Sequence, residues 1–356
     1  MRLLNITFDG RQKIYMTYST TKKVKLVDVA NLAECSTATV SRVLNDNPRV
    51  SKKGRERVLE AAASLGYVPN GAARALRSAN TKLVGVIIPT IDHAIYAIMV
   101  AGLQERLAKS GVSLIINTSA YDCELEYKQA RILVEHGVET IVLVGTEHHS
   151  RTMDLLKAKA VDYVLTYTCS TIGRGAAIGF DNRKAGALAA KYLHSLGHKR
   201  FGMITGITKG NDRARERRDG FLSELEALGV TLNSIQILES PYEVSGAIQA
   251  TKILLNSDPR PTAIFCGSDI IAAGVIKFCN IKGLQVPYDL SVVGFDNLEI
   301  ASLVSPQLTT LEVPARQMGT LAAEYTLSDD IQRRFLREQE LDVKLVVRES
   351  SSAPSV

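Results

Sequence analysis

The sequence of 356 residues contains no tryptophan, only five cysteines and no long apolar run. No stretch approaches the roughly 20 apolar residues of a membrane-spanning helix, so we expect no membrane partner. Residues 1–23 have no uninterrupted apolar core and no small-residue cleavage site, which argues against a secretory signal. The cysteines are odd in number and lack CxxC spacing, a pattern that favours free thiols in a reducing cytoplasm.

Motifs typical of enzymes are also missing. Residues 173–179, GRGAAIG, come close to a dinucleotide-binding loop, but Ile178 stands where the G-x-G-x-x-G pattern requires its last glycine. The GITKGN segment lacks the Lys-Ser/Thr of a phosphate-binding loop, and there is no G-x-S-x-G elbow. The histidines show no metal-ligand spacing with cysteine, and we expect His148 and His149 in a solvated loop. We therefore expect neither an enzyme nor a bound cofactor or metal.

The net charge of +6 is distributed unevenly. Residues 1–80 hold 14 Lys and Arg against 6 Asp and Glu, whereas residues 81–356 hold 29 against 31. Positive charge concentrated in a small N-terminal region predicts a polyanionic partner there. A merely solvated basic segment would have the same composition, so the charge needs support from motifs.

Three short helices are expected in the region 23–66, after an irregular extension over 1–22. Their expected bounds, from apolar residues at helical spacing, are 26–34, 36–45 and 52–66. Ser36 and Ser51 are placed to cap the second and third helices, and Gly66 to end the third. The expected small core consists of Val29, Ala30, Ala33, Val40, Val43, Leu44, Val58 and Leu59.

The second of these helices carries short polar side chains where ordinary solvated helices prefer Glu and Lys. Two helices joined by a tight turn, the second rich in hydroxyls, fit the helix-turn-helix plan, in which the second helix enters the major groove of DNA. Arg42 is placed to reach guanine O6 and N7. Lys52 and Lys53 oppose the dipole of the third helix, an arrangement that a nearby phosphate would favour. Capping and solvation alone are the alternative explanation of these residues.

The segment 67–80 is expected to be a hinge. Asn70 can cap a helix over 71–77, which at about two turns is too short to be stable alone in water, so we expect it to fold only against DNA and a partner copy. Leu76 lies between basic residues and suits a wedge that opens a base step from the minor groove. Packing of Leu76 on the domain that follows is the alternative.

From Thr81 onward, short β-rich runs such as LVGVIIP, TIVLVG and LSVVGFD alternate with amphipathic helical stretches. This alternation predicts βαβ units, parallel sheets and helices on both faces. About ten strands exceed one comfortable sheet, so we expect two lobes, each with a doubly wound parallel sheet. Ligands of such sheets bind beyond the carboxyl ends of the strands, which places a site in the cleft between the lobes.

Several motifs resemble the lactose-repressor (LacI/GalR) family of bacterial transcription regulators. They are, in chain order, DVANLAECSTATVSRVLN, GYVPNGAARALR, SLGHKRFGMITG, RARERRDGF, SDIIAAGVIKFCNIKGLQVPYDLSVVGFDN, LTTLEVP and LVVRES. The resemblance implies an N-terminal all-α helix-turn-helix domain and a two-lobed α/β core that is periplasmic-binding-protein-like. It also implies a homodimer, or a tetramer, that binds pseudopalindromic operator DNA and a small-molecule effector.

The resemblance implies a domain organisation as well. The expected domains are 23–66 for DNA binding, 67–80 for the hinge, 81–350 for the core and 351–356 for a tail. Within the core, the expected lobes are 81–180 with 308–328, and 181–307 with 329–350.

Roles of single residues follow from the resemblance by position. Thr37, Ala38 and Arg42 correspond to base readers, and Ser36, Thr39 and Ser41 lie nearest the DNA backbone. The corresponding hinge residues are Asn70, Ala73, Arg74, Leu76 and Arg77. The corresponding effector residues are His93, Ile95, Tyr96, Asp181, Arg217, Tyr242, Asp269 and Asp296. An arginine and carboxylates that converge on a cleft suit a polyhydroxylated or anionic ligand, such as a sugar or a sugar acid.

The chain departs from the family pattern at two places. Members commonly read Asn-Pro-Phe-Phe where this chain has HAIY at 93–96, so stacking on a sugar ring rests on Tyr96 and Tyr242, with no tryptophan to help. Glu34 occupies a turn position where a small residue is frequent. If that turn needs a positive φ, glutamate costs about 1 kcal/mol there.

Together these features predict a sequence-specific repressor of a catabolic operon, whose operator affinity is switched by an effector between the lobes. Whether the effector releases the DNA or tightens the complex stays open, because both use the same parts. The alternative is an extracytoplasmic sugar-binding protein of a transporter. The two-lobed core would fit it equally well, but the missing signal and the basic helical head argue against it.

Overall fold

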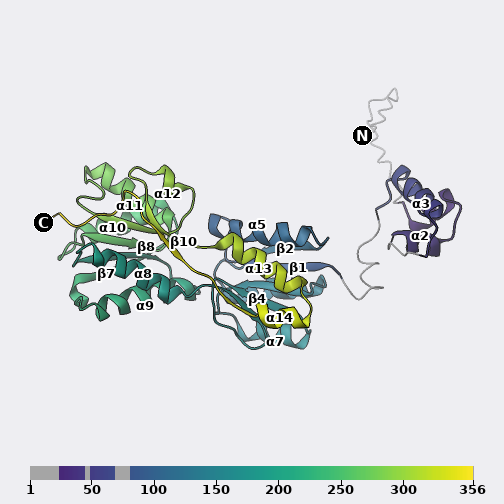
Figure 1. Cartoon of the computed structure of the whole chain (residues 1–356), viewed down its shortest axis with the longest axis horizontal. Coiled ribbons are helices and arrows are strands. Elements are labelled where there is room, and N and C mark those ends of the chain that lie inside the picture. Colours follow the sequence, from purple (N-terminus) through teal and green to yellow (C-terminus); the bar gives the residue numbers. More distant parts are fainter. Residues whose placement is uncertain (1–23, 45–48, 69–80, 356) are drawn as a thin grey trace, which may run out of the picture. The chain divides into compact units, whose positions relative to one another are not determined.

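The computed structural model describes residues 24–44, 49–68 and 81–355, which belong to two compact units, Met1–Thr81 and Lys82–Val356 (Figure 1). We call the described residues of the first unit, 24–44 and 49–68, the head, and the second unit the core. Within these residues, no helix is long and apolar enough to cross a membrane.

The head consists of three short helices. They are α1 (Leu26–Leu32), α2 (Thr37–Leu44) and α3 (Lys52–Ser64). Both serine caps are confirmed: Ser36 Oγ accepts from Thr39 N at 3.1 Å, and Ser51 Oγ accepts from Gly54 N at 3.2 Å. The predicted core is confirmed except for Leu59, whose side chain is 48% exposed. Ala61 and Ala62 take its place against α1 and α2, because α3 turns that face inward.

The turn between α1 and α2 does require a positive φ at Glu34, the case in which the sequence predicts strain there. Glu34 adopts a φ of +49°, in the left-handed region that disfavours residues with a Cβ atom. Its backbone N–H donates to Asn31 O, and the next N–H, of Cys35, donates to Ala30 O. Glutamate therefore sits at a strained position in the turn that sets the angle between the two helices.

The first lobe of the core is a six-stranded sheet with helices on both faces (Figure 1). Its elements are β1 (Leu83–Ile88), α5 (Ala94–Ala108), β2 (Ser113–Thr118), α6 (Cys123–Glu135), β3 (Thr140–Val144), α7 (Ser150–Ala158), β4 (Asp162–Thr166), β5 (Ala176–Gly179), α13 (Ala315–Leu327), α14 (Asp330–Leu336) and β11 (Glu338–Glu340). The strand order is β11-β5-β4-β3-β1-β2, with every pairing parallel. Helices α5 and α13 cover one face, and α6 and α7 cover the other.

The second lobe repeats this architecture. Its elements are α8 (Asn182–Ser195), β6 (Phe201–Gly206), α9 (Asp212–Ala227), the 3-10 helix η1 (Leu232–Ser234), β7 (Ile235–Ser240), α10 (Val244–Leu255), β8 (Ala263–Cys266), α11 (Asp269–Lys282), β9 (Ser291–Asp296), α12 (Ile300–Leu303), β10 (Thr309–Glu312) and β12 (Lys344–Val346). The order is β12-β10-β9-β8-β6-β7, and only β12 runs antiparallel to its neighbour. The predicted pair of doubly wound sheets is confirmed.

The lobe boundaries near the C-terminus differ from the expected ones. β10 extends the second sheet beside β9, so the chain returns to the first lobe after residue 312 and not at 308. It then stays in the first lobe through α13, α14 and β11, and only β12 rejoins the second sheet. The expected segment 308–328 is thus corrected to about 313–340, because strand pairing decides which lobe a segment joins.

Replacing the strained glutamate of the head gives a first test. We expect Glu34→Gly to stabilise the head by about 0.5–1 kcal/mol, because relief of the left-handed strain exceeds the extra entropy that glycine gives the unfolded chain. The measurement is the unfolding free energy of the head, from hydrogen exchange of its helices. The control is Glu60→Gly inside α3, which should destabilise the head, since glycine weakens a helix interior. Equal losses in both variants would contradict the strain at Glu34.

Candidate nucleic-acid surface and ligand cavity

Helix α2 has one buried and one exposed face. Val40 and Val43 are buried against α1 and α3, with Leu44 partly buried beside them. All three predicted base readers are exposed: Thr37, Ala38 and Arg42. The helix therefore presents two small side chains at its first turn and one long cation further along, as a helix that approaches DNA bases closely requires.

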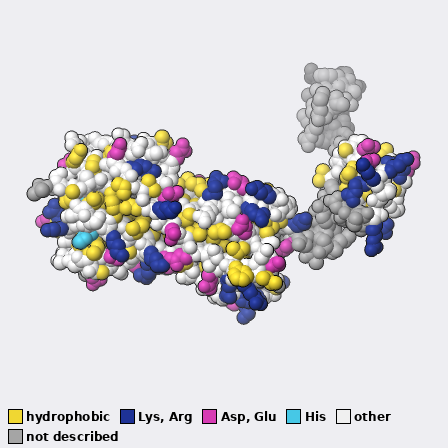
Figure 2. All heavy atoms as spheres, viewed as in Figure 1, with side chains coloured by type: hydrophobic (Ala, Val, Ile, Leu, Met, Phe, Trp, Pro, Cys, Tyr) yellow, Lys and Arg dark blue, Asp and Glu magenta, His cyan; other side chains and the backbone are white. Residues whose placement is uncertain are grey.

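The residues predicted near the DNA backbone, except Ser41, lie at helix starts. Ser36 and Thr39 share a hydrogen bond between their hydroxyls at 2.9 Å, and Ser41 is partly exposed. Lys52 and Lys53 are exposed in the first turn of α3, where no acidic residue accompanies them. Figure 2 shows Lys and Arg side chains on the visible surface of the head. The predicted hinge residues Asn70, Ala73, Arg74, Leu76 and Arg77 lie outside the described residues.

A cavity of about 220 Å³ lies between the two lobes of the core. Six of the eight predicted effector residues line it: His93, Ile95, Tyr96, Arg217, Tyr242 and Asp296. The other lining residues are Asp92, Ala94, Tyr121, Tyr167, Asn211, Arg213, Gly267, Ser268, Ile270, Phe295 and Leu298. The cavity thus combines aromatic walls with two arginines, two carboxylates and an amide.

Arg217 is a buried cation in the wall of the cavity. Its side chain is 7% exposed, and its guanidinium lies over the Phe295 ring with 4.2 Å between Cζ and the ring centroid. Nη1 donates to Asn182 Oδ1 at 2.6 Å, but the buried Nε has no hydrogen-bond partner among the described residues. A buried guanidinium is costly without compensating contacts, so the Phe295 ring and the Asn182 amide hold Arg217 in the wall of the cavity, where it can meet a ligand's acceptor.

The packing of α8 against α9 brings Asn182 to Arg217. A Cβ at Gly186 of α8 would lie 2.0 Å from the backbone oxygen of Arg217, so only glycine allows the two helices to approach this closely. Asn182 also donates from Nδ2 to Tyr167 O at 2.9 Å. One amide side chain thereby links the arginine of the second lobe to the end of β4 in the first.

Aromatic side chains form the walls of the cavity. Tyr96 and Tyr167 pack edge to face, with 5.3 Å between ring centroids, and the Tyr167 hydroxyl donates to Ile95 O at 2.8 Å. His93 of the first lobe contacts Tyr242 of the second with ring centroids 4.8 Å apart, and its Nδ1 lies 3.2 Å from the Tyr121 hydroxyl. Burial lowers the pKa of His93, against the opposing charge of Asp92. Four tyrosines therefore supply the stacking surface that the absent tryptophan does not.

The two predicted carboxylates at the carboxyl ends of β8 and β9 have different positions. Asp296 lines the cavity, and burial raises its pKa well above the usual value, with a further contribution from Asp269 and opposition from Arg217. Asp269 does not line the cavity. It is fully buried and accepts from Thr310 Oγ1 at 2.5 Å and from Leu298 N at 2.6 Å. Asp269 thereby fixes the loop that carries Asp296, whose φ is +109°.

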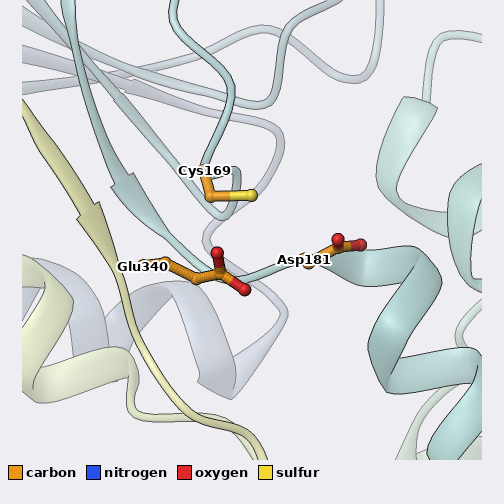
Figure 3. Close-up of side chains that lie close together, drawn as sticks. All are labelled: Cys169, Asp181 and Glu340. Carbon is orange, nitrogen blue, oxygen red and sulfur yellow. The ribbon is translucent and has the colours of Figure 1, made fainter.

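The structure does not bring Asp181 into the cavity. Its carboxylate caps α8 by accepting from Lys184 N at 3.0 Å, and it faces Cys169 and Glu340 (Figure 3). Lys184 Nζ lies 2.5 Å from Glu340 Oε1 and 3.9 Å from Asp181 Oδ2. The side chain is therefore held by a helix terminus and a lysine, outside the cavity lining.

Other cavity residues were missed from the sequence. Tyr121 and Tyr167 both have positive φ, 60° and 59°. Tyr121 lies in the loop after β2, and Tyr167 directly follows β4. Asn211 caps the start of α9, and Arg213, in its first turn, is the first residue of the quoted RARERRDGF motif. The position after a parallel strand was the signal that could have found the tyrosines. His148, expected in a solvated loop, is instead buried, with Nδ1 3.0 Å from Glu126 Oε1.

A head with an exposed polar helix and a two-lobed core with a ligand cavity define a ligand-regulated DNA-binding protein. Comparisons with known proteins agree. Residues 25–70 match the family described as bacterial regulatory proteins, lacI family, and residues 190–351 match a periplasmic binding protein-like domain.

Individual relatives cover most of the chain. The ribose operon repressor of Haemophilus influenzae is 33% identical, over 84% of this chain and 90% of its own length. Among solved structures, a LacI-family regulator from Silicibacter pomeroyi superposes with a TM-score of 0.85 at 26% identity, covering 92% of this chain and 99% of that one. The Lac repressor dimer bound to operator and the anti-inducer ONPF gives 0.82 at 27% identity, covering 93% and 100%.

This chain belongs to the lacI family of bacterial regulatory proteins. It is a DNA-binding transcriptional repressor that a small-molecule ligand regulates.

The burial of Asp269 predicts a pH dependence of stability. Burial raises its pKa from 3.8 to about 7, although hydrogen bonds from Thr310, Leu298 and Phe295 oppose the rise. Because the folded pKa lies above the unfolded one, the contribution to stability is complete below pH 3.8 and is lost as the pH rises through 7.

We expect Asp269→Asn, which cannot ionise, to remove about 2 kcal/mol of the stability difference between pH 5 and pH 7. The measurement is urea unfolding of the core at both pH values. Asp154→Asn, which changes an exposed carboxylate of α7, serves as the control and should keep the wild-type profile. Parallel profiles in wild type and Asp269→Asn would contradict the buried titration.

Proposed function

We propose that this protein represses a catabolic operon by binding a pseudopalindromic operator as a dimer, and that a polyhydroxylated metabolite in the interlobe cavity switches this binding. The observation that carries the ligand assignment is that the buried Arg217 and the Asp296 carboxylate line the same cavity. An arginine and a carboxylate can together hold hydroxyl groups on both sides of one small ring.

The base-reading surface is α2. Arg42 extends from the exposed face and can donate two hydrogen bonds to guanine, while Thr37 and Ala38 let the helix approach the groove edge. The hydroxyls of Ser36, Thr39 and Ser41 and the cations Lys52 and Lys53 bind phosphates and orient the head. The hinge residues Asn70, Ala73, Arg74, Leu76 and Arg77 complete the interface at the minor groove, an assignment that rests on the sequence alone.

The chemistry of the cavity selects the ligand class. Tyr96 and Tyr167 supply ring faces, while Arg217, Asp296 and Asn211 supply polar groups at the edges. Sugars, sugar acids and related polar metabolites have this combination of a stackable ring and peripheral oxygens. The name of the ribose operon repressor supports a sugar as the natural effector.

The proposed oligomeric state and cellular compartment follow from operator binding. Two heads on one operator gain from their high effective concentration, so we place the protein in the cytoplasm as a homodimer, with a tetramer as a pair of such dimers. We assign it no catalytic activity and no cofactor. The cavity groups are used to bind a ligand, and the switch acts through the relative position of the lobes.

Changing the proposed base reader tests the DNA surface. We expect Arg42→Ala to cost about 1–3 kcal/mol at one operator position and to relax the preference for guanine there. The measurement is affinity for a set of single-base operator variants. Lys52→Ala is the control and should weaken binding evenly across sequences while lowering the salt slope by about 1. Unchanged selectivity of Arg42→Ala would refute the assignment.

Changing the cavity arginine tests the effector site. We expect Arg217→Ala to lose the response to ligand while operator binding survives, because the head does not contain this residue. A panel of sugars, sugar acids and nucleobases is screened by thermal shift, where ligand at 100 times its Kd adds about 2.7 kcal/mol. Arg218→Ala, whose guanidinium pairs with Asp219 and does not line the cavity, should respond like wild type. A retained response in Arg217→Ala would move the site elsewhere.

A further inference from the structure

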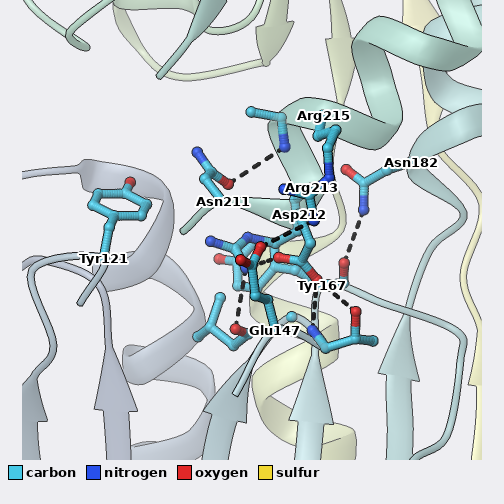
Figure 4. A network of polar contacts seen from close by, with 12 residues as sticks. Tyr121, Glu147, Tyr167, Asn182, Asn211, Asp212, Arg213 and Arg215 are labelled. Atoms are coloured by element: carbon cyan, nitrogen blue, oxygen red, sulfur yellow. Dashed lines mark hydrogen bonds and ion pairs between the residues drawn. The ribbon is translucent and has the colours of Figure 1, made fainter. Parts of the chain in front are cut away.

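Two segments from opposite lobes meet beside the cavity through buried polar groups. The loop after β3 belongs to the first lobe, and the start of α9 belongs to the second. Asp212 Oδ2 accepts from Thr146 N at 2.5 Å and from Thr146 Oγ1 at 2.8 Å. Arg213 Nη1 donates to Asp212 Oδ1 at 2.5 Å and to Val144 O at 3.1 Å (Figure 4). We call Thr146, Asp212 and Arg213 the clasp.

The charges of the clasp are buried and matched. Asp212 is 3% exposed and Arg213 is 5% exposed. Burial would raise the pKa of Asp212, but Arg213 and the two Thr146 donors outweigh it, and the net pKa lies below the usual value. Asp212 is therefore ionised at neutral pH, and its charge is compensated partly by its own lobe and partly by the other. Separating the lobes would leave the pair without its partners in the first lobe.

The contact is too close for any side chain at residue 145. A Cβ at Gly145 would lie 2.1 Å from Arg213 Nη1 and 2.5 Å from Asp212 Oδ1. His148 fixes the loop that carries Gly145. The backbone oxygen of Gly145 accepts from His148 Nε2 at 3.1 Å, and the other ring nitrogen of His148 contacts the buried Glu126. The first lobe thus offers a fixed, side-chain-free surface to the second lobe at this point.

The same arginine also lines the cavity. Arg213 therefore contacts the first-lobe loop and also faces the cavity. A ligand group that accepts a hydrogen bond from Arg213 would stabilise the guanidinium in the position that the clasp requires. Occupancy of the cavity and closure of the lobes then favour each other, as linkage demands of two events that share one residue.

We propose that the clasp is the interlobe contact through which ligand binding is coupled to lobe closure, with Asp212 as the residue that positions Arg213 for both. This inference rests on the proposed effector function and adds its regulation. Two neighbouring contacts lie at the same boundary: Arg215 Nη2 pairs with Glu147 Oε2 at 3.0 Å, and Gly210 packs on Tyr121 O. Because Arg215 and Glu147 are about 40% exposed, their pair is screened by solvent, whereas the clasp is not.

Two glycine variants test the clasp on the full chain. Gly145 has a φ of +84° and Gly229 a φ of +80°, so an alanine meets the same backbone strain at either place. Only at Gly145 would the new Cβ meet the clasp, since no atom lies within 4 Å of a Cβ at Gly229. Gly145→Ala is therefore the test, and Gly229→Ala is its matched control.

The readout is hydrogen exchange followed by mass spectrometry. We expect Gly145→Ala to speed exchange in the peptides over 144–148 and 209–216 by about tenfold, equivalent to about 1.4 kcal/mol, relative to Gly229→Ala. Strands of both sheets should exchange as in wild type. Equal exchange in the two variants would overturn the proposal. No ligand or DNA is used, so this failure would leave operator binding and ligand binding, each measured separately, intact as claims.

A second pair of variants covers the case in which Gly145→Ala does not fold. Thr146→Val removes the hydroxyl that donates to Asp212, and Thr152→Val removes a buried hydroxyl that has no hydrogen-bond partner among the described residues. We expect Thr146→Val to speed exchange over 209–216, in the lobe that it does not belong to, and Thr152→Val to leave that peptide unchanged. Unchanged exchange over 209–216 in Thr146→Val would likewise overturn the proposal.

Discussion

The direction of the parallel strands determines where the cavity residues lie. Every lining residue lies in the last two residues of a strand or in the loop or helix that follows it: His93 after β1, Tyr121 after β2, Asn211 after β6 and Ser268 after β8. Because both sheets turn these carboxyl ends toward the same cleft, residues far apart in the sequence meet there. Arg217 lies one turn deeper on α9, and the close packing of α8 brings Asn182 to it. Strand direction thus decides which positions line the cavity, and the side chains at those positions then decide what the cavity can bind.

The sequence was sufficient for the architecture of both units, because long amphipathic helices alternate with strongly apolar strands. It was weakest for the shortest strands. β5 has only four residues, Ala176–Gly179, which overlap the near-match to a dinucleotide-binding loop at 173–179, and β11 and β12 each have three residues. Such segments carry too few side chains to show a period, and their strand character comes from pairing with a neighbour. The lobe boundary at residue 312 was missed for the same reason, since only the pairing of β10 with β9 defines it.

The candidate site was predicted in part. Arg217, Tyr96, Tyr242 and Asp296 stand in the cavity as expected, whereas Asp181 and Asp269 do not. Each of these aspartates lies at the end of a strand or at the start of a helix, so their sequence contexts are alike. What separates them is the competition for each carboxylate: backbone N–H groups and Lys184 hold Asp181, and Thr310 and Leu298 hold Asp269. Only three-dimensional packing reveals which carboxylates keep an oxygen free for a ligand.

The exchange of C-terminal strands between the two sheets has a consequence for synthesis on the ribosome. β11 completes the first sheet and β12 the second, and Ser350 Oγ then donates to Val292 O in β9 and accepts from Thr309 N in β10. Neither lobe has all its strands until this last segment has left the exit tunnel, so β5 stays unpaired on one side while residues 180–337 are made, and β10 stays so until β12 follows it. A nascent chain with two open edges is a substrate for chaperones, and a messenger truncated before codon 338 yields a product with both lobes incomplete.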